Sequence, residues 1–130
     1  MFLYVRYDEK VKSYSRSPLA LSEHDESIVR YYLPKNEVVA DLADFFSVFS
    51  DATRVKILTS LSITEMCVTD ICLMLGQVQS TVSHQLAFLR SLRMVKTRRR
   101  GKVIYYSLAS PYVEKVLELG VRFLKGKSKL

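Results

Sequence analysis

Residues 68–92 read VTDICLMLGQVQSTVSHQLAFLRSL, and the spacing of their apolar side chains predicts two short helices. In the first helix the apolar residues fall at positions i, i+3, i+4 and i+7, which share one helix face. These residues are Val68, Ile71, Cys72 and Leu75. Gly76 stands where a glycine commonly ends a helix. The buried side of the second helix is expected to consist of Val82, Leu86, Leu89 and Leu92. Two short helices joined by such a turn are typical of a helix-turn-helix.

A basic β-hairpin is predicted directly after this pair of helices. The segments MVKTRRR (94–100) and KVIYYSL (102–108) are β-prone, and Gly101 between them can take the positive φ of a tight turn. Helix-turn-helix followed by a hairpin is the order of a winged helix. In that fold the second helix enters the DNA major groove and the wing lies along the backbone. We call residues 68–108 the reading head.

The reading head supplies two sets of residues for DNA contact. Polar side chains of its second helix can reach base edges or phosphates. They are Gln79, Ser80, Thr81, Ser83, His84 and Gln85. Cations of the wing can neutralise phosphates. They are Arg98, Arg99, Arg100 and Lys102. For His84, a purely structural role is an equal alternative.

Further helices are predicted on both sides of the reading head, with one expected to stop before Pro34. The residues predicted to begin them are Ser22, Asn36, Ser50 or Asp51, and Ser110 with Pro111. The expected fold is therefore mainly α with a small β-hairpin, a winged helix-turn-helix. The expected divisions are an arm with a short helix over residues 1–33, a DNA-binding and dimerisation domain over 34–126, and a basic tail over 127–130.

The net charge of +7 comes from one part of the chain. Between Ile71 and Val113 there is no Asp or Glu, whereas the wing and its approach are rich in Arg and Lys. Elsewhere the acidic and basic side chains balance. A solvated basic face is the plainer interpretation, but segregation over so long a segment favours a polyanionic partner, and we expect nucleic acid.

The length of 130 residues fits one globular domain with a modest core, and 48% of the residues are hydrophobic. We expect a cytoplasmic protein with no membrane partner, because no apolar run is long enough to span a bilayer and no signal-like segment begins the chain. Two cysteines are too few for a disulfide framework. The sequence contains neither a nucleophile and base in a catalytic order nor a phosphate-binding glycine loop. We therefore expect no enzymatic activity.

A helix-turn-helix alone reads only half of an operator, so specificity favours a homodimer on double-stranded DNA with two-fold symmetry. The outer N-terminal and C-terminal helices carry apolar stripes wider than a small core requires. The residues expected at the dimer contact are Phe45, Phe46, Val116, Leu117 and Leu124, with filling of the monomer core as the alternative.

Four motifs in this order resemble the ArsR/SmtB family of metal-responsive winged-helix repressors. They are LADFFSVFSDATRVKIL (42–58), EMCVTDIC (65–72), STVSHQLAFLRSLRMV (80–95) and RRRGKVIYYSL (98–108). The resemblance covers about two thirds of the chain. It implies a homodimeric repressor that needs no cofactor to bind DNA and that leaves its operator when an inducer binds.

The resemblance also implies where a metal inducer would bind. Cys67 and Asp70 match the family's Cys-Val-Cys-Asp motif, although Thr69 stands in place of the second cysteine. Cys72 matches a further cysteine of arsenite-sensing members, and His24 matches a ligand from the N-terminal arm of zinc and cadmium sensors. The inducers implied are therefore zinc, cadmium or arsenite.

Helix geometry leaves open what the cysteines of EMCVTDIC (65–72) do. Cys67 is expected at the N-cap of the first reading-head helix, where the positive end of the helix dipole favours a thiolate that can bind metal or react. Asp70 can equally be a capping residue. Cys72 lies about 140° around the helix from Cys67, which favours a packing role for Cys72.

One hypothesis for the function is metal sensing at Cys67. The alternatives are a repressor that responds to thiol oxidation or another signal, and a DNA-organising or RNA-binding module without an inducer.

Overall fold

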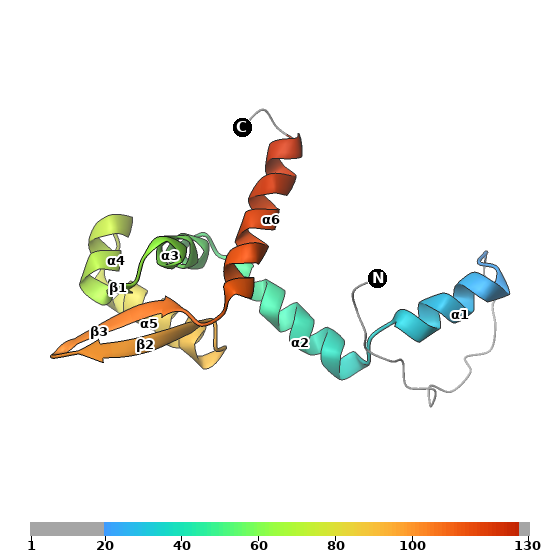
Figure 1. Ribbon diagram of the computed structural model, residues 1–130, viewed down its shortest axis with the longest axis horizontal. Helices are drawn as coiled ribbons and strands as arrows, with labels where there is room; N and C mark the ends of the chain where they lie inside the picture. Colours follow the sequence, from blue (N-terminus) through green and yellow to red (C-terminus); the bar gives the residue numbers. More distant parts are fainter. Residues whose placement is uncertain (1–19, 128–130) are drawn as a thin grey trace. The chain divides into compact units, whose positions relative to one another are not determined.

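The computed structural model describes residues 20–127, which include six α-helices and a small antiparallel sheet (Figure 1). The chain divides into two compact units between Asp44 and Phe45. Residues 1–19 of the expected arm and residues 128–130 of the expected tail lie outside the described residues. The division into arm, domain and tail stays a prediction.

The first unit contains α1 (Glu23–Tyr32) and most of α2 (Asn36–Ser47). Ser22 caps α1 as predicted, because its side-chain oxygen accepts a hydrogen bond from the backbone N–H of Asp25 at 3.1 Å. The helix ends before Pro34, whose ring restricts the residue in front of it. Both helix positions agree with the sequence pattern.

In the second unit, a 3-10 turn (Val48–Ser50) leads into α3 (Ala52–Ile63). Of the two predicted caps, Asp51 is the one used, since it accepts from the N–H of Arg54 at 2.9 Å. The Arg54 side chain donates back to the carbonyl of Val48 at 3.0 Å and lies over the ring of Phe88, with 4.9 Å to its centroid. Arg54 therefore ties the turn before α3 to α5.

The predicted helix-turn-helix consists of α4 (Val68–Leu75) and α5 (Gln79–Ser91). Gly76 ends α4 in the left-handed region with φ of 62°, as its position predicted. At the end of α5 the same conformation is adopted by Arg93, with φ of 57°. There the N–H of Met94 donates to Leu89 O at 2.9 Å and that of Arg93 to Arg90 O at 3.0 Å, the two hydrogen bonds of a Schellman motif.

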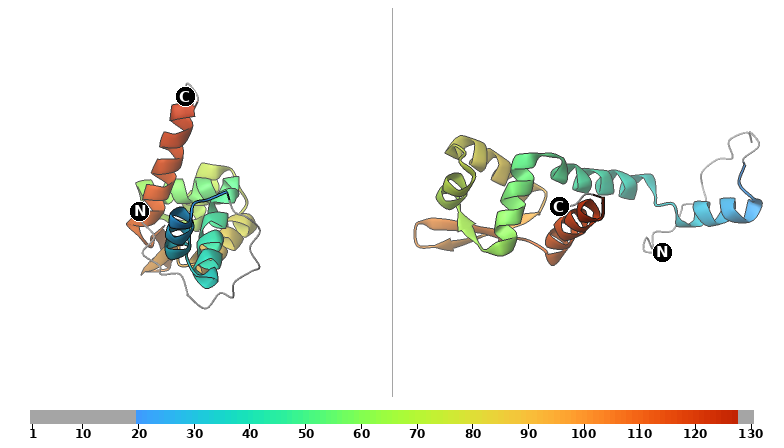
Figure 2. Two further views of the ribbon diagram at one scale, coloured as in Figure 1. Left: turned by 90° about the vertical axis from the view of Figure 1, so that its right-hand side faces the viewer. Right: turned by 90° about the horizontal axis from the view of Figure 1, so that it is seen from above.

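The predicted hairpin consists of β2 (Val95–Arg100) and β3 (Val103–Leu108), with Gly101 at φ of 63° in the two-residue turn. A third strand was not predicted. It is β1 (Met66–Cys67), which pairs antiparallel with β3 and gives the sheet order β1-β3-β2. Figure 1 and the right-hand view of Figure 2 show the hairpin extending away from α6 (Pro111–Lys127).

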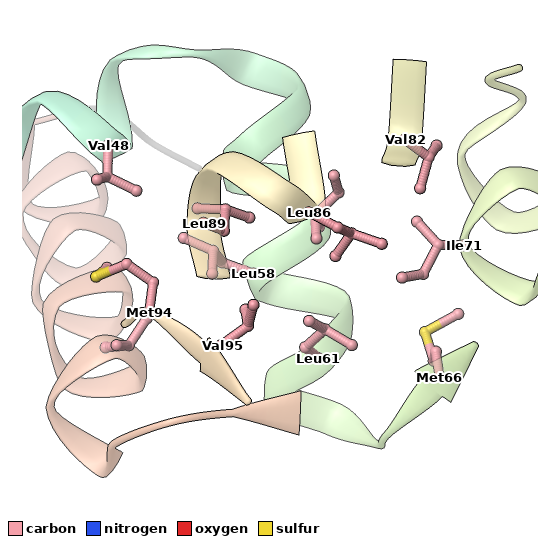
Figure 3. Packing of buried hydrophobic residues seen from close by; sticks show 12 residues of the cluster. Val48, Leu58, Leu61, Met66, Ile71, Val82, Leu86, Leu89, Met94 and Val95 are labelled. Atoms are coloured by element: carbon pink, nitrogen blue, oxygen red, sulfur yellow. The ribbon is translucent and has the colours of Figure 1, made fainter. Parts of the chain in front are cut away.

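Side chains from α3, α4, α5 and the sheet meet in one apolar core (Figure 3). The predicted buried residues Ile71, Val82, Leu86 and Leu89 have no exposed surface. Leu92 is an exception at 39% exposure, and its predicted burial is wrong. The reason is that α5 ends at Ser91, so Leu92 is the C-cap and the chain turns there toward the wing.

The last helix, α6, begins as predicted with Ser110 and Pro111, where the Ser110 hydroxyl accepts from the N–H of Tyr112 at 3.2 Å. Among residues 20–127 no helix has the length and apolarity needed to cross a membrane. The observed architecture is the expected winged helix-turn-helix of mainly α class.

Candidate functional site

The polar residues of α5 lie on the side of the helix away from the core. Val82 and Leu86 are buried, whereas Ser80, Ser83 and His84 are exposed. Gln79 is also exposed, and Thr81 and Gln85 are half-buried. Because α5 is packed along its other side against α3 and α4, it presents this polar face on a rigid support.

The wing places its cations around the two-residue turn. Arg98, Arg99, Arg100 and Lys102 are all exposed. The side chain of Arg99 donates to the carbonyl of Gly101 at 3.0 Å, which fixes its position beside the turn. No Asp or Glu of α5 or the hairpin offsets these charges, so the surface is suited to a polyanion.

One acidic residue nevertheless contacts the wing. The guanidinium of Arg98 forms a two-pronged ion pair with the Glu65 carboxylate, with Nε to Oε2 at 3.1 Å and Nη2 to Oε1 as the second contact. The hydrogen bond from Arg98 lowers the pKa of Glu65 below its ordinary value, and Glu65 raises the pKa of Arg98. Both side chains are partly exposed, so the pair contributes little to overall stability.

Cys67 occupies the N-cap of α4, as predicted. Its backbone N–H donates to Oδ2 of Asp70 at 3.3 Å, and its Sγ lies 3.1 Å from the same oxygen. The carboxylate thus acts as the predicted cap and also stands beside the thiol. A sulphur and an oxygen this close can be two ligands of one cation.

The other predicted metal ligands lie apart from this pair or in the other unit. Cys72 is half-buried and packs against the apolar core. His24 is exposed in the first turn of α1, in the unit before Asp44. Among the described residues, no three His, Cys, Asp or Glu side chains form a group able to hold a metal ion. Cys67 and Asp70 therefore supply two ligands and need others to complete a metal site.

The residues expected at a dimer contact divide into two groups. Phe45 and Leu117 are half-buried and pack against the monomer core, and Val116 is half-buried on α6. Phe46 and Leu124 are more than half exposed, at 53% and 54%.

A groove of about 700 Å³ runs between α3 and α6. The surface of its lining is mostly apolar, and Val55, Val116, Leu117 and Val121 are among the residues that form it. Leu119 and Phe123 are further exposed apolar residues on the same helix, at 64% and 62%. The last helix thus retains a large apolar surface that the described residues do not cover.

Sequence reasoning missed β1 and the role of Glu65. Two residues are too few to show strand alternation, so β1 carries no recognisable pattern. The available signal for Glu65 was its place as the last acid but one before the acid-free segment.

Residues 51–97 match the model of the family described as "Bacterial regulatory protein, arsR family". This segment runs from the cap of α3 into the wing. The chain is 44% identical over 72 residues to the transcriptional repressor SmtB homolog of Synechocystis, a match that covers 55% of this chain and 54% of that protein. It thus spans about half the length of that relative. It is 35% identical over 83 residues to the cadmium resistance regulatory protein CadC of Listeria innocua, covering 63% of this chain and 70% of that one.

Solved structures agree with the fold. NolR from Sinorhizobium fredii is 32% identical and superposes with a TM-score of 0.60, covering 83% of this chain and 96% of that one. The family and the two relatives are named as regulators of transcription and not as enzymes. The family match includes both α4 and α5 of the reading head. The chain therefore belongs to the ArsR family of bacterial regulatory proteins.

Proposed function

We propose that the chain is a sequence-specific transcriptional repressor that binds a two-fold symmetric operator as a homodimer. The observation that carries this proposal is the exposed polar face of α5 beside a wing whose cations are exposed. In this arrangement the α5 side chains read base edges in the major groove, and the wing neutralises backbone phosphates. The contacts are assigned to Gln79, Ser80, Thr81, Ser83, His84 and Gln85 of α5, and to Arg98, Arg99, Arg100 and Lys102 of the wing.

Backbone groups add to this proposed contact. Val78 is the N-cap of α5, and its side chain accepts no hydrogen bond from the N–H groups of the first turn. A helix N-terminus of this kind suits a phosphate oxygen, since both the N–H groups and the helix dipole favour a negative charge. Because chromosomal DNA is the ligand, the cytoplasm is the proposed compartment.

Dimerisation supplies the second half-site reader. Exposed and half-buried apolar side chains of α2 and α6 are proposed to meet their counterparts in the second protomer. The proposed contact comprises Phe45, Phe46, Val116, Leu117 and Leu124. Phe46 and Leu124 are its more exposed members, and their exposure is what a partner would relieve.

The proposed inducer is a metal ion or metalloid bound at Cys67. Cys67 and Asp70 offer a soft and a hard ligand 3.1 Å apart, and the CadC relative of Listeria innocua is named for cadmium resistance. A bound cation would supply a positive charge that holds these two ligands together. Zinc, cadmium and arsenite are the ions to test, with His24 and Cys72 as the proposed further ligands.

Thiol oxidation is the second candidate for the signal. It is favoured by the small set of ligands around Cys67 among the described residues, and by the partial exposure of its thiol. An oxidised sulphur at the N-cap of α4 would alter the helix whose orientation positions α5.

One titration distinguishes a metal or metalloid inducer from thiol oxidation. A labelled duplex from upstream of the chain's own gene is bound by the reduced protein, and its anisotropy is followed as zinc, cadmium, arsenite or peroxide is added. We expect zinc, cadmium or arsenite to release the DNA from the parent protein but not from Cys67→Ser, and to do so only at a higher concentration with Cys72→Ser, which lacks one proposed ligand. Release by peroxide alone would support oxidation instead. Release by none of them, together with an unchanged Cys67→Ser variant, would contradict both.

A further inference from the structure

The ion pair between Glu65 and Arg98 crosses the whole sheet. Glu65 directly precedes β1 and Arg98 lies on β2, and these strands form the two edges of the order β1-β3-β2. Between them, the guanidinium carbon of Arg98 lies 5.6 Å from the ring centroid of Tyr105, a residue of the central strand. One side chain therefore connects all three strands.

The strand register explains how this is possible. Arg98 pairs with Tyr105, and Tyr105 pairs with Cys67, so these three side chains share one face of the sheet. Arg99 pairs with Ile104 and lies on the opposite face. Two neighbouring arginines of the wing thus have different surroundings.

We propose that Arg98 is a positioning residue of the wing, which acts on DNA binding through Glu65 and Tyr105 rather than by contacting a phosphate. The strap, defined as Glu65, Tyr105 and Arg98, fixes the hairpin relative to β1 and so to the N-terminus of α4. Arg99, Arg100 and Lys102 then deliver the phosphate contacts from the hairpin that the strap orients. This inference rests on the proposed DNA-binding function and replaces the phosphate contact proposed above for Arg98 with a positioning role.

The opposite role for Glu65 is competition, in which the carboxylate merely occupies Arg98 until a phosphate displaces it. The geometry favours the strap. Two donors of the guanidinium contact both carboxylate oxygens, and its position over the central strand adds a third interaction. These three interactions hold the Arg98 side chain along the face of the sheet.

A charge swap tests the proposal, because it preserves the net charge while exchanging the partners. We expect Arg98→Glu to weaken binding to the upstream duplex by about fivefold or more. The double variant Glu65→Arg with Arg98→Glu should recover affinity to within about twofold of the parent protein. Affinity of the double variant as low as that of Arg98→Glu would overturn the strap, since a direct phosphate contact cannot be restored from position 65.

Arg99 provides the matched control on the opposite face of the sheet. Arg99→Glu should weaken binding, and adding Glu65→Arg should not restore it beyond the small effect of the extra positive charge. Equal rescue of Arg98→Glu and Arg99→Glu would show a general charge effect and would also overturn the proposal.

Amide hydrogen exchange on the free protein separates this inference from the proposed function. We expect backbone amides of β2 and β3 to exchange at least about threefold faster in Arg98→Glu, and at the parent rate in the swapped variant. Unchanged exchange in Arg98→Glu would overturn the strap even if the protein binds DNA. A parent protein that binds no specific duplex would instead contradict the proposed function, and the exchange result would still decide the strap.

Discussion

Lys102→Gln removes one cation from the tip of the wing with little disturbance to the fold. Lys102 is exposed in the two-residue turn between β2 and β3, next to Gly101. If each protomer of a dimer places Lys102 at a phosphate, the variant loses two phosphate contacts per operator. Each contact contributes about 0.9 to the slope of log affinity against log salt, so the slope should fall by about 1.8.

That change in slope gives a change in affinity that can be measured. If both proteins bind equally at about 1 M salt, the variant should bind about 30-fold more weakly at about 0.15 M. Fluorescence anisotropy with a labelled upstream duplex over a salt series gives both quantities. Lys125→Gln, in the last turns of α6, is the control and should leave the slope unchanged. A weaker Lys102→Gln complex with the parent slope would refute the reasoning, because the lysine would then act through structure and not through charge.

Further predictions concern stability, measured by urea or thermal unfolding. Leu86→Ala should lower the free energy of unfolding by about 2–5 kcal/mol, since Leu86 has no exposed surface in the core. Leu73→Ala on α4, where the side chain is 77% exposed, should change it by less than about 0.5 kcal/mol. Arg93→Gly should stabilise the protein by about 0.5–1 kcal/mol, because φ of 57° strains a residue with a side chain. Equal effects of the two leucine substitutions, or a destabilised Arg93→Gly, would contradict these assignments.

The helices of the reading head were predictable because they carry both apolar periodicity and local end signals. Val82, Leu86 and Leu89 repeat at helical spacing, and all three are fully buried. Gly76 marks the end of α4 because its left-handed conformation favours glycine. These signals are local, so a single sequence contains them.

The features that escaped prediction depend on contacts distant in sequence or on overridden preferences. The contact between Glu65 and Arg98 joins residues 33 positions apart, and no local pattern encodes such a pair. Arg93 adopts a backbone conformation that its side chain disfavours, because the burial of Leu89 and Met94 on either side of the turn outweighs that preference. Burial of Leu92 was predicted wrongly for a related reason, since the apolar spacing continues one residue past the end of the helix.

The exposure of the candidate DNA-contact residues and the placement of the candidate metal ligands were predictable to different degrees. The polar residues of α5 and the wing cations follow directly from the periodicity and from the charge segregation. Of the candidate metal ligands, Cys67 and Asp70 come together because they are the N-cap and N3 residues of α4, whose side chains lie close at a helix start. The contribution of Cys72 depended on its orientation, and the structure packs it against the core. Orientation of this kind is decided by tertiary packing.

The central claim is that two protomers read one specific DNA sequence. The most direct test measures the stoichiometry and affinity of the protein with the duplex upstream of its own gene and with a scrambled duplex of equal length and composition. Analytical ultracentrifugation at about 0.15 M salt provides the stoichiometry, and competition anisotropy provides the affinity ratio. We expect two chains per duplex and at least about a thousandfold preference for the upstream sequence. A single bound chain, or equal affinity for both duplexes, would contradict the account.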